Sequence, residues 1–266
     1  MKTLYLDCFC GISGNMFIGM LIQAGVPFDE FKQAMTALNL EGYSLTCESV
    51  SKMGIQSVYY NVLLDSEKHH HHEDHTHDVH EHAVDTAGHH HHHEHRGLSE
   101  ITKIIEASPY KEEIKKKSLQ VFQNLAQAEA TVHGVPVDKI HFHEVGAIDC
   151  ILDIVGTIWA LDYLGIEQVA SSALHVGSGF VKCAHGVMPV PAPATAELLT
   201  GIPYYDTDVW GELVTPTGAA LVKTLASYIG PRPDTFIHDC VAYGAGTKDL
   251  EIPNVVRGFI GQANAW

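Results

Sequence analysis

Basic residues are scarce in this chain. It contains 16 Lys and Arg against 32 Asp and Glu in 266 residues, a formal net charge of −16 with the histidines neutral. We therefore do not expect nucleic acid as a partner, because a protein that binds phosphate backbones needs a basic face. The acidic surplus favours cations as ligands instead.

The chain also lacks C-x-x-C pairs and a long uninterrupted apolar run, and we expect no cleavable leader. Its longest apolar stretch, residues 150–165, contains Asp153 and Asp162 and therefore predicts a buried helix. Lys2 and the apolar residues after it superficially resemble a signal peptide, but Asp7 and the G-I-S-G sequence interrupt them. We expect a soluble, cytoplasmic protein with six reduced cysteines and no membrane contact.

Several catalytic signatures are missing as well. The sequence has no G-x-S-x-G, no H-E-x-x-H, no Walker A motif and no dinucleotide-binding fingerprint. A hydrolase interpretation therefore has no specific motif behind it. The hydrophobic content of 45% and the mean hydropathy of +0.01 predict a globular protein with a sizeable core.

Alternating β-rich and helical segments predict an α/β fold with mixed α+β layers. We expect residues 1–65 and 98–266 to pack as one domain, with a flexible, disordered His-rich insertion at 66–97 between a β-hairpin and a helical segment. The expected helices are 15–24, 28–39, 98–107, 109–133, 144–164, 195–199 and 216–228. The expected strands are 3–9, 43–50, 56–64, 168–177, 204–209, 236–243 and 255–260.

Fourteen of the twenty histidines fall inside the chain between His69 and His95, mixed with acidic residues. Imidazole with occasional carboxylate suits borderline divalent metals such as nickel, zinc and copper, so the segment predicts metal loading. The alternative is a polar, disordered surface loop. The histidines are His69, His70, His71, His72, His75, His77, His80, His82, His89, His90, His91, His92, His93 and His95.

The densest cluster of possible ligands outside that segment is H-F-H-E-V-G-A-I-D-C-I-L-D, residues 141–153. Imidazoles two apart on an extended chain point the same way, and carboxylates four apart on a helix share a face. Such a set can coordinate a divalent cation or do acid–base work, and helix capping is the alternative for Glu144. The candidate metal ligands are His141, His143, Glu144, Asp149, Asp153, Glu129 and His133.

Two further loops could hold an anion. C-G-I-S-G-N-M follows a strand and precedes a helix, so its backbone could cradle an oxyanion, although many tight turns look alike. Residues 176–195 form a loop rich in Gly and Pro that carries Lys182, Cys183 and His185, and His185 could equally be structural. The candidate phosphate- or substrate-binding residues are Asp7, Gly11, Ser13, Gly14, Asn15, Lys182, Lys248 and Arg257. Asn254 is a further possible contact, and Cys8 and Cys10 are either soft metal ligands or buried, inert thiols.

Taken together, these motifs resemble the LarC family, the nickel-insertion proteins of nickel-pincer cofactor biosynthesis. The resemblance runs from L-Y-L-D-C-F-C-G-I-S-G-N-M through H-F-H-E-V-G-A-I-D-C-I-L-D-I-V-G and H-G-V-M-P-V-P-A-P-A-T. It continues through E-L-V-T-P-T-G-A-A to Y-G-A-G-T-K-D-L-E-I-P-N-V-V-R. Where the family motif reads G-I-S-G-D-M, this chain has Asn15, which weakens any metal site there and makes Asp7 more important.

The resemblance implies a nickel insertase, a cyclometallase of the lyase class. Its substrates would be Ni(II) and pyridinium-3,5-bisthiocarboxylic acid mononucleotide, with CTP and Mn(II) or Mg(II). Nucleotide binding would belong to a C-terminal module of the family, which we expect to be separate from this chain. This chain would then be the N-terminal, metal- and substrate-binding part, and a homo-oligomer is left open.

Insertion needs a base for the ring proton, and the candidates for this catalytic role are His141, His143, Glu144 and His185. The competing interpretation is a nickel metallochaperone or storage protein without catalysis. If residues 66–96 were deleted, a metallochaperone would lose its function, whereas an insertase would keep its activity at high nickel concentration.

Overall fold

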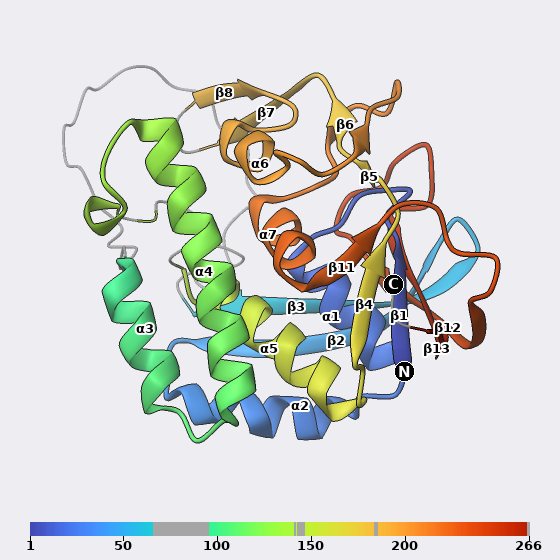
Figure 1. Ribbon diagram of the computed structural model, residues 1–266, viewed down its shortest axis with the longest axis horizontal. Helices are drawn as coiled ribbons and strands as arrows, with labels where there is room; N and C mark the ends of the chain where they lie inside the picture. The colour runs from blue at the N-terminus through green and yellow to red at the C-terminus, as the bar shows by residue number, and fades with distance from the viewer. Residues whose placement is uncertain (66–95, 141, 143–146, 184–185, 265–266) are drawn as a thin grey trace, which may run out of the picture.

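A mixed β-sheet of seven strands organises the part of the chain that the structure describes (Figure 1). The computed structural model describes residues 1–65, 96–140, 142, 147–183 and 186–264. The strand order is β11-β4-β1-β13-β12-β3-β2. The strands are β1 (Lys2–Asp7), β2 (Tyr43–Lys52), β3 (Ile55–Leu64), β4 (Gln168–Ser171), β11 (Ala226–Ile229), β12 (Ile237–Ala245) and β13 (Val255–Gln262).

The strands run in both directions. β1, β4 and β11 are parallel, β13 is antiparallel to both β1 and β12, β12 is parallel to β3, and β3 pairs with β2 as a hairpin. The hairpin turns at Met53 and Gly54, both with positive φ. Strands from before and after the His-rich segment therefore share one sheet.

The helices cover one face of this sheet in layers. α1 lies on β3, β12 and β13, and α7 lies on β4 and β11. α5 packs on α1 and α7, and α4 packs against α5 and α7. Leu4 and Leu6 of β1 point into this layer and are fully buried. The α-helices are α1 (Gly14–Gln23), α2 (Phe28–Met35), α3 (Leu98–Ala107), α4 (Glu112–His133), α5 (Ile148–Tyr163), α6 (Pro193–Leu198) and α7 (Pro216–Leu225), with 3-10 turns η1 (Thr36–Leu38) and η3 (Val137–Lys139).

The other face of the sheet carries a small aromatic cluster. Side chains alternate along a strand, so Tyr5 points away from Leu4 and Leu6. It lies 6.4 Å from Phe236 and 6.5 Å from Phe259 between ring centroids.

Short strands and α6 form a cap beyond the carboxyl ends of β1 and β4 (Figure 1). They pair as β5 with β9, β6 with β10 and β7 with β8. Their bounds are β5 (Leu174–His175), β6 (Gly177–Ser178), β7 (Phe180–Cys183), β8 (Gly186–Pro189), β9 (Tyr204–Tyr205) and β10 (Gly211–Glu212).

The predicted mixed α/β class is confirmed, and four predicted elements need correction. The strand predicted at 168–177 is divided into β4, β5 and β6: residues 172, 173 and 176 belong to no strand, and Gly177 has a φ of +85°. The loop predicted before Ala194 contains the β7–β8 hairpin. The strand predicted at 204–209 is reduced to β9.

The fourth correction concerns the helix predicted at 216–228. It ends at Leu225, and the next residues form β11 at the edge of the sheet, where Tyr228 and Ile229 suit a strand. The helix predicted at 144–164 is described from Ile148 onward, and the His-rich insertion lies outside the described residues. None of the helices described is long and apolar enough to cross a membrane.

Candidate functional site

A cavity of about 400 Å³ lies between the end of α4 and the β7–β8 hairpin. It brings together side chains that are up to 87 positions apart in the sequence, from Glu129 to Pro216. Its polar lining residues are Glu129, His133, Lys182, Cys183 and Glu212. Its apolar lining residues are Val132, Val181, Met188, Ala192, Pro193, Ala194 and Pro216.

The Glu129–His133 pair forms one wall of this cavity. The two residues are four positions apart on the last turns of α4, and His133 Nε2 lies 3.4 Å from Glu129 Oε2. Gly134, with a φ of +64°, ends the helix directly afterwards. The local sequence thus presents a carboxylate and an imidazole side by side, as the i,i+4 spacing predicts.

The donor set in this cavity is suitable for a borderline metal but incomplete. Imidazole, carboxylate and thiolate are all ligands that nickel accepts. Within the described ranges, however, no three His, Cys, Asp or Glu side chains lie close enough together to hold a metal ion. A metal bound at Glu129 and His133 would therefore take further ligands from a bound molecule or from elsewhere in the chain.

A second cavity, of about 230 Å³, shares Glu212 with the first. It lies where α1 and α7 begin, and Ser13 and Thr215 are the N-cap residues of these helices. Asn15, Thr247 and Lys248 also line it. Helix N-termini, hydroxyl groups and an ammonium group favour an anion.

The glycine loop before α1 is packed more tightly than an open anion cradle. Gly11, with a φ of +74°, donates its N–H to Cys8 O (3.0 Å), and Ile12 donates to Leu213 O (3.0 Å). A side chain at Gly11 would collide with the backbone of Leu213, and one at Gly14 would collide with Asp153. These glycines permit close packing, while Ser13 and Asn15 are the loop residues that reach the second cavity.

Asp153 and Tyr60 place unpartnered polar atoms inside the protein. Asp153 Oδ1 and the Tyr60 hydroxyl are buried and accept or donate no hydrogen bond within the described part of the chain. Burial, and then the charge of Asp149, raises the pKa of Asp153 well above its usual value. Asp149 is exposed, and neither carboxylate lines the two cavities, so their predicted metal role stays a prediction.

Asp7 and Arg257, both predicted substrate contacts, contact each other in the structure. Arg257 Nε and Nη2 donate to Asp7 Oδ2, the former at 3.1 Å. The guanidinium also lies over the rings of Phe9 and Phe259, at 5.5 and 5.0 Å. A phosphate would have to compete with Asp7 for this cation.

The two N-terminal cysteines are buried, which is the second of the two predicted alternatives. Burial raises the pKa of Cys8 to about 12 and that of Cys10 to about 11. Cys10 donates to Asn254 Oδ1 at 3.7 Å, and Asn254 Nδ2 donates to Lys248 O at 2.8 Å. Asn254 is therefore part of the packing that holds Lys248 in place.

His175 is a residue that sequence reasoning missed. It is 2% exposed, lies 2.7 Å from Phe9 O through Nδ1 and 2.9 Å from Thr207 Oγ1 through Nε2, and stacks on Tyr205. Nδ1 faces a carbonyl oxygen and therefore donates, while Nε2 shares a hydrogen bond with the Thr207 hydroxyl group. His175 thus connects the loop after β1 to the cap through hydrogen bonds. The sequence did not indicate this role, because a single histidine in an apolar stretch has no motif around it.

The remaining predicted residues lie outside the described residues. They are the base candidates His141, His143, Glu144 and His185 and the fourteen histidines of the His-rich segment.

Comparison with known proteins gives consistent matches over nearly the whole chain. A family model described as nickel insertion protein matches residues 4–266. The pyridinium-3,5-bisthiocarboxylic acid mononucleotide nickel insertion proteins of Desulfitobacterium hafniense and Geobacillus kaustophilus are 46% and 44% identical to it, over 98% of this chain in each case. A putative nickel insertion protein of Dictyoglomus thermophilum is 39% identical over 98% of this chain.

These relatives are longer than this chain. The matches cover 59%, 60% and 61% of their respective lengths, so the chain spans about three-fifths of them. No solved structure gives a significant match.

Proposed function

The chain belongs to the nickel insertion protein family, and we propose that it is the metal- and substrate-binding part of a nickel insertase. The reaction would place Ni(II) into pyridinium-3,5-bisthiocarboxylic acid mononucleotide, the compound named for its relatives. The observation that carries this proposal is the cavity in which Glu129 and His133 face Lys182, Cys183 and a mainly apolar wall.

The incomplete donor set in the cavity suits transfer of a metal better than storage. Glu129 and His133 supply one oxygen and one nitrogen donor, with Cys183 within the same cavity. A site that must release nickel into a ligand should hold it through few protein atoms. The two thiocarboxylates of the precursor would supply the missing donors and draw the metal onward.

The shape of the lining suits the rest of the precursor. Val132, Val181 and Met188 offer apolar surface for the pyridinium ring. The second cavity continues past Glu212 with Ser13 and Lys248, which are suitable partners for the mononucleotide's phosphate. The precursor would thus lie across both cavities, with its ring near the metal and its phosphate near the start of α1.

The insertion step itself exchanges a proton for the metal. The ring C–H bond breaks, its electron pair forms the nickel–carbon bond, the two sulfurs bind nickel, and the proton passes to a base. His141, His143, Glu144 and His185 stay the candidates for this base. Nickel would reach the cavity from the His-rich segment, where many weak sites raise its local concentration.

CTP with Mn(II) or Mg(II) would act through the part of the family's length that this chain does not cover. None of the motifs in this chain is a nucleotide-binding fingerprint. We therefore assign CTP to that other part and the metal and the mononucleotide to this chain.

Calorimetric titration of Ni(II) tests the proposed site. A background in which a Gly/Ser linker replaces residues 66–95 removes the competing histidines. In that background, Glu129→Gln and His133→Gln should each weaken nickel binding at least about tenfold, because losing even a group that only supports a metal ligand has an effect of this size. His238→Gln, at an exposed histidine on β12, is the matched control. Equal affinity in all four proteins would rule out the Glu129–His133 pair as the metal site.

A further inference from the structure

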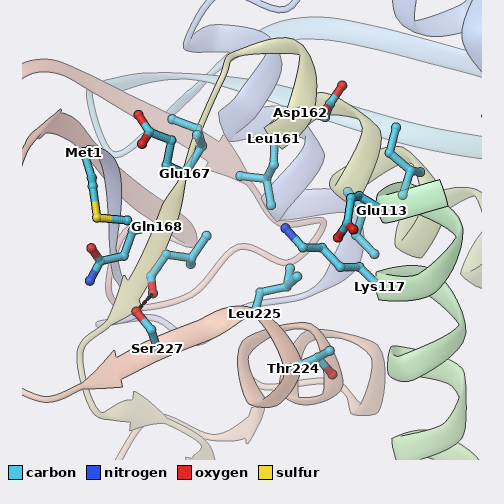
Figure 2. A pocket seen from close by; sticks show the side chains of 14 residues that line it. Met1, Glu113, Lys117, Leu161, Asp162, Glu167, Gln168, Thr224, Leu225 and Ser227 are labelled. Carbon is cyan, nitrogen blue, oxygen red and sulfur yellow. Dashed lines mark hydrogen bonds between the residues drawn. The ribbon is translucent and has the colours of Figure 1, made fainter. Parts of the chain in front are cut away.

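A third cavity lies at the end of the sheet opposite the proposed site. Figure 2 shows the side chains that line it. It has a volume of about 300 Å³ and opens at the amino ends of the parallel strands β1, β4 and β11, between the start of α4 and the end of α5. Its floor is apolar and includes Ile114, Leu161, Val169 and Leu225. The proposed function uses none of these residues.

Both ends of the described chain meet beside this cavity. Met1, which lines it, donates its amino group to Ala263 O at 3.0 Å, and Ala263 N donates to Met1 O at 3.1 Å. Chain attached at either end would therefore leave the sheet at this cavity. The relatives do have more chain, since the match covers only 59–61% of the length of the three named above.

The cavity also offers a hydrogen-bond acceptor and a strand edge that have no partner among the described residues. Gln168 is 6% exposed, and its Oε1 is buried without a hydrogen-bond partner among the residues described. Ser227 lies on β11, the last strand of the sheet on this side, and no further strand in the described part of the chain pairs with its outer edge. A buried acceptor and such a strand edge together suit an extended polypeptide.

The charges around the cavity indicate the chemistry of that polypeptide. The lining includes three carboxylates, of Glu113, Asp162 and Glu167, and two ammonium groups, of Lys117 and the chain's amino end at Met1. Asp162 is also paired with Lys111 at 2.7 Å. Figure 2 shows Lys117 reaching from α4 toward the cavity, with Glu113 on the same helix. The Glu113 carboxylate, exposed on α4 at the edge of the cavity, favours a segment that carries a basic residue beside an apolar side chain.

We infer that this cavity and the β11 edge form the docking surface for the part of the family's length that this chain does not cover. The docked segment would place an apolar side chain on Leu161 and Leu225, donate a hydrogen bond to Gln168 Oε1 and set a basic residue against Glu113. The inference rests on the proposed function, in which the second part binds CTP. It also places that part at the end of the sheet away from the nickel cavity.

The test uses this chain and the unmatched part of the Desulfitobacterium hafniense relative, produced together as two polypeptides. Circular dichroism checks that the second polypeptide is folded, and sedimentation and calorimetry measure the complex without nickel or mononucleotide. Ser227→Trp places a large ring in the cavity mouth and should weaken the complex at least about tenfold. Glu113→Lys should weaken it about threefold to tenfold.

Glu112→Lys is the matched control, because Glu112 is exposed on the same helix and lies outside this cavity. Unchanged affinity in Ser227→Trp and Glu113→Lys would overturn the inference, as would a self-association of this chain that Ser227→Trp abolishes. Because docking is measured without nickel, a complex that forms here but inserts no metal would contradict the proposed function alone. Nickel binding with no docking at this cavity would contradict the inference alone.

Discussion

Replacing Gly244 with alanine should destabilise the fold at the point where α1 rests on the sheet. A Cβ at this position of β12 would lie 1.7 Å from Met16 O and 2.6 Å from Met20 N, where ordinary contacts begin at 3.4 Å. Both neighbours are backbone atoms of α1, so no side-chain rotation relieves the clash, and α1 must move by more than 1 Å. Overpacking of this kind costs about 3 kcal/mol at the upper end of the usual range. The better strand propensity of alanine returns up to about 1 kcal/mol, so we expect a net loss of about 2 kcal/mol.

Urea denaturation followed by circular dichroism measures this loss directly. Gly97→Ala is the control, because its nearest neighbour, Ile140 O, would lie 3.7 Å from the new Cβ, and its cost should stay below about 1 kcal/mol. Since Ser13 begins α1 and lines the second cavity, Gly244→Ala should also weaken binding of the mononucleotide. An unfolding free energy equal to that of the unmodified protein would show that α1 does not pack on β12 as described.

Three further predictions follow from the buried groups and the second cavity. Burial raises the pKa of Asp153 well above its usual value of 3.8, so at pH values between the two the folded protein binds a proton that the unfolded chain does not. The free energy of unfolding should therefore fall as pH rises from 3.8 toward the raised pKa. Urea denaturation at several pH values should show no such decline for Asp153→Asn. If the free energy of unfolding depended on pH in the same way in both proteins, the raised pKa of Asp153 would be refuted. Iodoacetamide at pH 8 should leave Cys8 and Cys10 unmodified in the folded protein, because burial raises their pKa values to about 12 and 11, and mass spectrometry of peptides reads this out. Lys248→Gln should weaken binding of the mononucleotide about tenfold and leave nickel affinity unchanged, and equal loss of both would contradict a phosphate role for Lys248.

Local periodicity predicted much of the fold. The helix at 98–107 and the hairpin around Met53 and Gly54 follow from apolar spacing and turn residues, and the structure has them at nearly those bounds. β11 was missed because Ala226–Ile229 continues an apolar pattern that also fits the end of a helix. These residues form a strand because they pair with β4. Their partners lie more than 55 positions earlier in the sequence, so a local pattern cannot reveal the pairing.

The candidate site was predictable only in part, for the same reason. The i,i+4 spacing of Glu129 and His133 is a local signal, and the structure has the two side chains together. That this pair faces Lys182 and Cys183 depends on the β7–β8 hairpin, which was predicted as a loop. The Asp7–Arg257 pair joins opposite ends of the chain through the register of β1 and β13, so each residue alone looked available to a substrate.

Insertion of Ni(II) into pyridinium-3,5-bisthiocarboxylic acid mononucleotide tests the central claim most directly. Absorbance and mass spectrometry would follow the product with this chain alone, and again with the remaining part of a longer relative and CTP. The account predicts product in the combined reaction, and a rate at least about tenfold lower when His133→Gln replaces the unmodified chain. Tight nickel binding without product in either reaction would contradict the insertase and favour a nickel metallochaperone.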